Sequence, residues 1–151
     1  MTNTRPDNHT VTLADGSTLA YTLHVAPAAG APRLVLIHSL ALDRSVWNAT
    51  VAQLSMDAEI LVYDCRGHGQ SDRRAGPFTA ELFARDLAEL LDHISWNSAS
   101  LAGCSMGGCV ALAFAGLHPR QGRGAWPDRH HGVVRRGRCC QVSRARRRSA
   151  C

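Results

Sequence analysis

Apolar residues in the first part of the chain occur in short runs, separated by stretches rich in glycine and polar residues. The runs at 33–38, 60–64 and 99–102 have the length and composition of strands that are buried on both faces. Between the last two runs, apolar side chains recur at helical spacing over 79–93 and predict a helix there. The residues that carry this spacing are Leu82, Phe83, Leu87, Leu90 and Leu91.

Two further helices and a hairpin complete the pattern. One helix is expected around Trp47 and another over 108–117, each after an apolar run. Residues 10–13 and 18–23 flank a turn at Gly16 and predict a β-hairpin. Strands that alternate with helices in this order predict an α/β fold, with a mostly parallel sheet, flanking helices and right-handed crossovers.

The pattern stops near Pro119, where the charge of the chain also changes. Residues 1–119 contain seven Arg and eleven acidic residues, a net charge of −4, whereas residues 120–151 contain ten Arg and one acidic residue, a net charge of +9. Residues 120–151 show neither helical nor strand periodicity. We therefore expect one α/β domain, or part of one, over 1–119 and an arginine-rich tail without a predicted fold over 120–151.

Two explanations of the tail are open. Clustered arginines neutralise phosphates, so the tail could be a basic arm that binds nucleic acid. The alternative is a frameshift near residue 120. Codons that encode residues 126–136 can, when read one nucleotide later, spell an apolar strand followed by Asp-Thr. We favour the frameshift, and expect no specific nucleic-acid partner.

Composition indicates a cytoplasmic protein. Residues 1–9 are polar and lack the pattern of a signal peptide, and no apolar run approaches the roughly 18 residues of a membrane-spanning helix.

The six cysteines lack the spacing of a zinc site, so we expect no metal and no cofactor. The sequence predicts no oligomeric state.

The segment Gly103-Cys104-Ser105-Met106-Gly107 matches G-x-S-x-G and lies between a predicted strand and a predicted helix. A sharp turn in this context lifts the serine hydroxyl above the sheet, and the flanking glycines leave room for the turn. The N-terminus of the following helix offers N–H groups to a developing oxyanion. We therefore predict Ser105 as a catalytic nucleophile; a small-residue turn without chemistry is the alternative.

Four landmarks in order give the chain a resemblance to the α/β-hydrolase family. They are the strand at 33–38 with its loop, the strand at 60–64, the D-x-R-G-x-G-x-S turn from Asp64 to Ser71, and the elbow at Ser105. The loop His38-Ser39-Leu40 and the elbow are most similar to those of 3-oxoadipate enol-lactonases. The resemblance implies an α/β-hydrolase fold and a small-molecule carboxylic ester or lactone as substrate. C–C hydrolases, haloperoxidase-like esterases and acyltransferases of the same fold are the alternatives.

The resemblance also implies an oxyanion hole made by the backbone N–H groups of Leu40 and Met106. Many members of the family have glycine where this chain has Ser39. Because the donors belong to the backbone, the serine is compatible with this assignment. We expect His38 to brace the loop that carries Leu40.

The acid and the histidine of the family's triad should follow Ser105 along the chain. Downstream, only Asp128 with His130 or His131 combines an acid and a histidine, and we interpret these as chance residues of a shifted frame. We therefore expect a fold truncated after the elbow helix and an inactive chain. The strand at 99–102, central in the family's sheet, is expected to be an edge.

Overall fold

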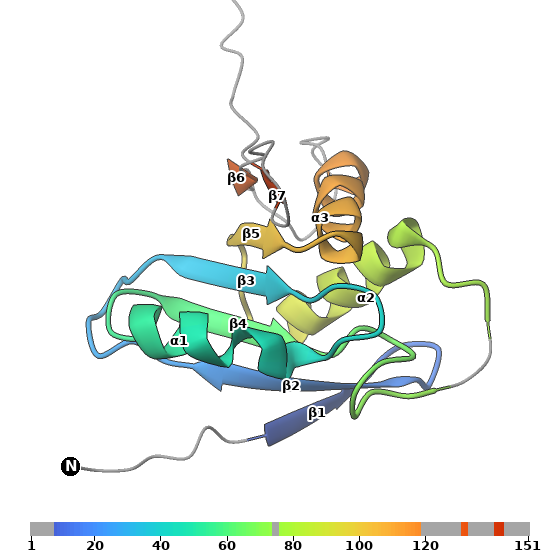
Figure 1. The fold of residues 1–151 in the computed structure, drawn as a ribbon, viewed down its shortest axis with the longest axis horizontal. Helices are drawn as coiled ribbons and strands as arrows, with labels where there is room; N and C mark the ends of the chain where they lie inside the picture. The colour runs from blue at the N-terminus through green and yellow to red at the C-terminus, as the bar shows by residue number, and fades with distance from the viewer. Residues whose placement is uncertain (1–7, 74–75, 119–130, 133–140, 144–151) are drawn as a thin grey trace, which may run out of the picture.

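The computed structural model describes residues 8–73, 76–118, 131–132 and 141–143 (Figure 1). These residues form one seven-stranded sheet with the order β1-β2-β4-β3-β5-β6, and β7 pairs with β5 on the same side as β6. The strands are β1 (Asn8–Thr12), β2 (Thr18–His24), β3 (Arg33–Ile37), β4 (Glu59–Tyr63), β5 (Ser100–Gly103), β6 (His131–Gly132) and β7 (Gln141–Ser143). The helices are the 3-10 turn η1 (Arg44–Trp47), α1 (Asn48–Leu54), α2 (Ala80–His93) and α3 (Met106–Leu117).

The predicted hairpin is confirmed. β1 and β2 pair antiparallel with Val11 opposite Leu19, and the turn between them places Gly16 at φ 80°. β2 continues the sheet by pairing antiparallel with β4. The hairpin therefore forms one edge of the sheet beside its parallel centre.

The centre of the sheet is parallel, as predicted. β3 lies between β4 and β5 and pairs parallel with both, with Leu36 opposite Val62 on one side and Ala102 on the other. Side chains alternate across β3: Val35 and Ile37 belong to the larger core cluster with α2 and α3, whereas Leu36 belongs to a smaller cluster with α1. Both faces are covered, which explains the continuous apolar run of β3.

α2 begins where the sequence predicted. The Thr79 side chain accepts a hydrogen bond from the Leu82 N–H at 3.1 Å and caps the helix. Phe83, Leu87 and Leu91 are buried against the sheet, whereas Leu82 is only half-buried. The apolar residues that recur at helical spacing thus form the face of α2 that packs against the core.

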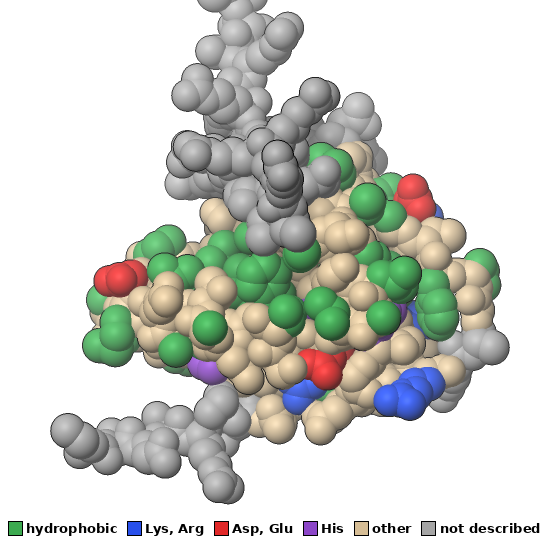
Figure 2. All heavy atoms as spheres, in the orientation of Figure 1, with side chains coloured by type: hydrophobic (Ala, Val, Ile, Leu, Met, Phe, Trp, Pro, Cys, Tyr) green, Lys and Arg blue, Asp and Glu red, His purple; other side chains and the backbone are tan. Residues whose placement is uncertain are grey.

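The α1 side of the sheet is less completely covered. Its core cluster is small, and Leu34 and Ala102 are only partly buried at its margin. Figure 2 shows hydrophobic side chains spread across this face of the molecule. α1 has only seven residues and cannot shield the full width of β3, β4 and β5.

The expectation that the strand at 99–102 forms a sheet edge is wrong. Within the described residues β5 pairs parallel with β6 through Ser100 and His131, and antiparallel with β7 through Ala102 and Val142. Backbone N–H and C=O groups pair irrespective of side-chain periodicity, so the amino-acid pattern of the tail did not reveal these short strands. The rest of 120–151 lies outside the described residues. The frameshift stays a prediction.

No helix in the described part of the chain has both the length and the apolar character needed to span a lipid bilayer.

Candidate active site

Ser105 stands at the apex of a strand–turn–helix elbow. It lies two residues after the end of β5, with Cys104 between, and immediately precedes the first residue of α3, with φ 50° and ψ −110°. This conformation is uncommon for any residue other than glycine and stores backbone strain. Ser105 is exposed. The predicted elbow is confirmed, with α3 beginning at Met106 rather than at residue 108.

The glycines of the motif are required by close backbone contacts. A Cβ on Gly103 would overlap the backbone of Gly107, and a Cβ on Gly107 would overlap the carbonyl of Ile37. The Cys104 N–H also donates to the Ile37 carbonyl at 3.1 Å. The elbow is therefore fixed against the end of β3.

The loop after β3 lies beside the elbow because of this contact. Its backbone turns at Ala41, which has φ 60°, and the Leu42 N–H donates to the Ser39 carbonyl at 3.2 Å. Ser39 itself has no positive φ. A serine therefore fits the position where many family members have glycine.

The two predicted oxyanion donors come from these neighbouring segments. Met106 is the first residue of α3, so its N–H precedes the helical hydrogen bonds. Leu40 lies in the loop after β3 and is 67% exposed. The structure brings the two segments together, and the role of the two N–H groups stays a prediction.

The chain matches the family described as alpha/beta hydrolase fold over residues 32–133. It belongs to the α/β-hydrolase fold family. This match confirms the fold predicted from the four landmarks.

Particular members of the family resemble the chain over part of their length. 3-Oxoadipate enol-lactonase 1 of Acinetobacter baylyi is 34% identical over 102 residues, which cover 68% of this chain and 37% of that protein. The crystal structure of the enol-lactonase from Burkholderia xenovorans LB400 has a TM-score of 0.68 and 36% identity, covering 73% of this chain and 42% of that one. A hydrolase from Pseudomonas aeruginosa PA01 has a TM-score of 0.69 and 35% identity, covering 76% and 42%. The chain thus spans about two fifths of the length of these relatives.

Within the described part of this α/β-hydrolase chain, the Ser105 hydroxyl makes no hydrogen bond to a histidine. His38 is completely buried, and both of its ring nitrogens lie at hydrogen-bond distance from backbone groups of Ser39 and Cys65. Asp128 and His130 lie outside the described residues, and His131 is in β6. Among the described residues, the structure therefore places no histidine in hydrogen-bond contact with the predicted nucleophile.

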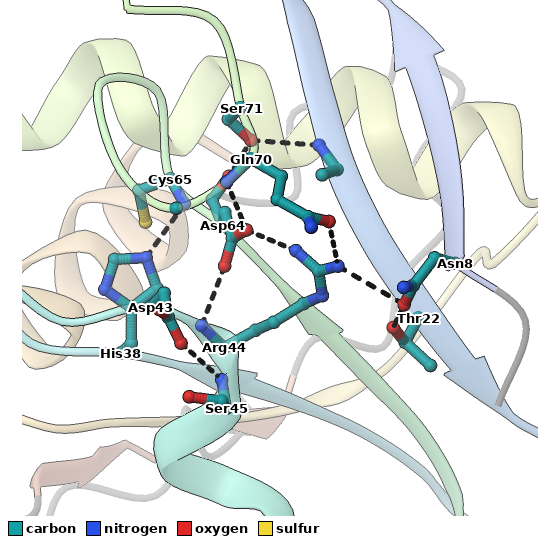
Figure 3. Close-up of polar contacts among 12 residues, drawn as sticks. Asn8, Thr22, His38, Asp43, Arg44, Ser45, Asp64, Cys65, Gln70 and Ser71 are labelled. Atoms are coloured by element: carbon teal, nitrogen blue, oxygen red, sulfur yellow. Dashed lines mark hydrogen bonds and ion pairs between the residues drawn. The ribbon is translucent and has the colours of Figure 1, made fainter. Parts of the chain in front are cut away.

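The turn after β4 is a structural junction that the sequence did not fully reveal (Figure 3). The buried Asp64 carboxylate accepts hydrogen bonds from the Arg44 N–H at 2.7 Å and the Gln70 N–H at 2.9 Å, and pairs with the Arg44 guanidinium. The Ser71 hydroxyl donates to the Asp64 carbonyl at 2.6 Å and accepts from the Ala20 N–H. Asp64 and Ser71 of the D-x-R-G-x-G-x-S turn thus hold η1 and β2 against the turn after β4. Arg44 carries no motif of its own, so no sequence signal marked it.

The arginine of the same turn is also structural. Arg66 is buried and donates through Nε and Nη2 to the two carboxylate oxygens of Asp86 on α2, at 2.9 and 2.7 Å. Its Nη1 donates to Asp15 and to the Ser17 hydroxyl in the hairpin turn. The Arg66 hydrogen bond lowers the pKa of Asp15 to about 2. A bidentate, charge-assisted fork of this kind fixes the turn between the hairpin and α2.

Two hollows occur away from the elbow. One of about 500 Å³ lies between the loop at 30–33 and the start of β5, and one of about 570 Å³ lies beside Arg44 and His24. Ser105 lines neither. Among the described residues, no group of three or more His, Cys, Asp or Glu side chains is arranged to hold a metal ion.

Proposed function

We propose that this α/β-hydrolase chain carries the nucleophile of an enzyme that cleaves a carboxylic ester or lactone similar to 3-oxoadipate enol-lactone. The observation that supports the proposal is the strained φ of Ser105, between β5 and the N-terminus of α3. The Ser105 hydroxyl would attack the carbonyl carbon and give up its proton to a base; the ester or lactone C–O bond would then break, the released oxygen would take up that proton, and the resulting acyl-enzyme would be hydrolysed by water. The carbonyl oxygen would gain negative charge toward the N–H groups of Leu40 and Met106. The enol-lactonase relatives support a lactone as substrate.

The second half of the proposal is that the 151-residue chain is inactive. The described residues give Ser105 no histidine to accept its proton. An oxyanion hole and substrate binding alone leave only about 10³–10⁴-fold catalysis over water. The base and acid would be supplied by the alternative reading frame after residue 119. A cytoplasmic location and a small-molecule substrate, without a cofactor, are part of the same proposal.

The test uses two proteins. The first is the 151-residue chain; the second, called the in-frame enzyme below, continues residues 1–119 in the shifted frame of the same gene. We expect the in-frame enzyme to hydrolyse an enol-lactone or a p-nitrophenyl ester, and Ser105→Ala to lower its kcat/KM by about three orders of magnitude or more. Cys109→Ala, an exposed position one helical turn further along α3, is the control and should leave activity unchanged. Full activity of the Ser105→Ala variant would show that the assignment is wrong.

Sequencing the gene across the codons for residues 115–130 tests the frameshift separately. An extra or missing base, followed by an open frame with a later Asp and a C-terminal His, is the expected result. A gene whose reading frame is intact, with no such alternative frame, would contradict the frameshift.

A further inference from the structure

Each predicted oxyanion donor shares a peptide group with a carbonyl. The Leu40 N–H belongs to the same planar unit as the Ser39 C=O, and the Met106 N–H to the same unit as the Ser105 C=O. In a trans peptide the C=O and the N–H point in opposite directions. Whatever fixes the carbonyl therefore fixes the direction of the donor.

The helix itself fixes the Met106 donor. The Ser105 carbonyl accepts hydrogen bonds from the Gly108 N–H at 2.9 Å and the Cys109 N–H at 3.2 Å in the first turn of α3. No side chain is needed to orient this peptide.

The Leu40 donor lies in a loop and has no helix to orient it. The Ser39 carbonyl accepts from the Leu42 N–H at 3.2 Å, and His38 Nδ1 lies 2.8 Å from the same oxygen. The His38 ring is the closer of the two partners and is completely buried. The buried His38 ring therefore holds the peptide group between Ser39 and Leu40 in place from its buried side.

The tautomer of His38 follows from its other nitrogen. Nε2 lies 2.9 Å from the backbone nitrogen of Cys65, in the turn after β4 (Figure 3). A backbone N–H can only donate, so Nε2 must be the unprotonated acceptor. The proton of the neutral ring is then on Nδ1, where it donates to the Ser39 carbonyl.

We propose that His38 is a positioning residue of the oxyanion hole, which orients the Leu40 N–H through the Ser39 carbonyl and does so only as the neutral Nδ1–H tautomer. The proposal rests on the proposed role of Leu40. His38 acts through a peptide plane and does not touch the substrate. Protonation would put a second N–H at Nε2, facing the Cys65 N–H, and would break the contact that holds the ring.

Charged and titratable groups surround His38 from two segments. Asp43 lies in the loop after β3, and Asp64 and His68 lie in the turn after β4, with the His68 ring centroid 5.0 Å from that of His38. Burial is the largest influence and lowers the pKa of His38, and His68 lowers it further, whereas the Ser39 hydrogen bond and the two carboxylates raise it. Since a lowered pKa keeps the ring neutral to lower pH, the Leu40 donor is held at neutral pH and released in acid.

The first experiment uses NMR on the uniformly ¹⁵N-labelled 151-residue chain, which reports both the histidine ring nitrogens and the backbone amides. The expected spectrum shows His38 with the proton on Nδ1 and a bare Nε2, and a Leu40 amide shift that moves with the protonation of His38 as the pH falls. A proton on Nε2, or a Leu40 amide that does not follow the titration of His38, would overturn the proposal. These readouts do not depend on activity, so they decide the proposal even if the proposed function fails.

A matched pair of variants tests the consequence in the in-frame enzyme. His38→Asn keeps an N–H near the Nδ1 position, whereas His38→Gln reaches the Nε2 position and loses the donor to Ser39. We expect His38→Gln to lower kcat by about 10-fold or more with little change in KM, because an oxyanion donor is misplaced, and His38→Asn to lower it by a clearly smaller factor. If His38 were purely structural, the loss of kcat in each variant would instead follow that variant's loss of thermal stability, whether or not the N–H near Nδ1 is kept. Activity that survives Ser105→Ala would reject the proposed function, and would be seen separately from this comparison.

Discussion

Gly107, in the first turn of α3, lies directly against the carbonyl oxygen of Ile37 at the end of β3. The contact joins two backbones with no side chain between them, and it places Ser105 beside the loop that follows β3. The position of the elbow therefore depends on the absence of one Cβ atom.

The first prediction is that Gly107→Ala destabilises the chain by about 1–3 kcal/mol or more, because the obstructing atom is backbone and cannot rotate away. The measurement is the urea midpoint of unfolding. Gly116→Ala is the matched control on the same helix, since a Cβ there meets nothing within 4 Å and alanine favours helix. If the two variants unfolded at the same urea concentration, the close contact would not be important.

The backbone of Ser105 gives the second prediction. Because φ 50° is unfavourable for a residue with a Cβ, Ser105→Gly should be more stable than Ser105→Ala by about 1 kcal/mol. Both variants remove the hydroxyl, so the difference reports the strain at φ 50° less the extra conformational entropy that glycine gives the unfolded chain. A Ser105→Gly variant with a urea midpoint equal to or below that of Ser105→Ala would contradict the prediction.

Asp15 provides a pH-dependent prediction. Its pKa is lowered from 3.8 to about 2 by the hydrogen bond from Arg66. The stabilisation from the ionised carboxylate is therefore present above pH 3.8 and is lost as the pH falls toward 2. Asp15→Asn should reduce the drop in urea midpoint between pH 5 and pH 2.5. If the urea midpoint of Asp15→Asn fell as much as that of the unaltered chain, carboxylates other than Asp15 would account for the loss of stability in acid.

The fourth prediction concerns the 151-residue chain as it stands. It should not react with a fluorophosphonate probe, since that reaction requires a serine activated by a base. The partly covered α1 face and the short strands beside β5 should also give a broad unfolding transition. The in-frame enzyme, labelled at Ser105, is the positive control. Rapid and saturable labelling of the 151-residue chain would reveal a base, and His130 and His131 would be the first residues to substitute.

The arginine-rich tail carries the fifth prediction. Any binding of the chain to DNA or RNA should be weak, independent of nucleotide sequence and strongly reduced by salt, because it is driven by counterion release. Titrations with two unrelated duplexes at several salt concentrations measure this. Strong preference for one duplex would instead support the basic arm as a function of the protein.

Sequence patterns within short segments of the chain were sufficient to predict most of the helices and strands, and also the elbow at Ser105. The apolar runs determined β3, β4 and β5, because a strand buried on both faces must be apolar throughout. The spacing of apolar residues over 79–93 predicted α2, and the cap that begins this helix is a hydrogen bond between Thr79 and Leu82, only three residues apart. G-x-S-x-G placed Ser105 between a strand and a helix, because the turn and its glycines are adjacent in sequence.

Only the tertiary structure decided the contacts between distant segments. The bond between His38 and Cys65 joins residues 27 positions apart, and the pair of Arg44 with Asp64 spans 20 positions. Likewise, β7 pairs with β5 although the sequence of the tail shows no strand pattern. Such contacts depend on where backbones meet in space, and backbone N–H and C=O groups are the same in every residue except proline. The sequence by itself therefore determined most of the elements before residue 119 and the position of the elbow that carries the predicted nucleophile, while the fold decided what holds the loop of Leu40 beside it.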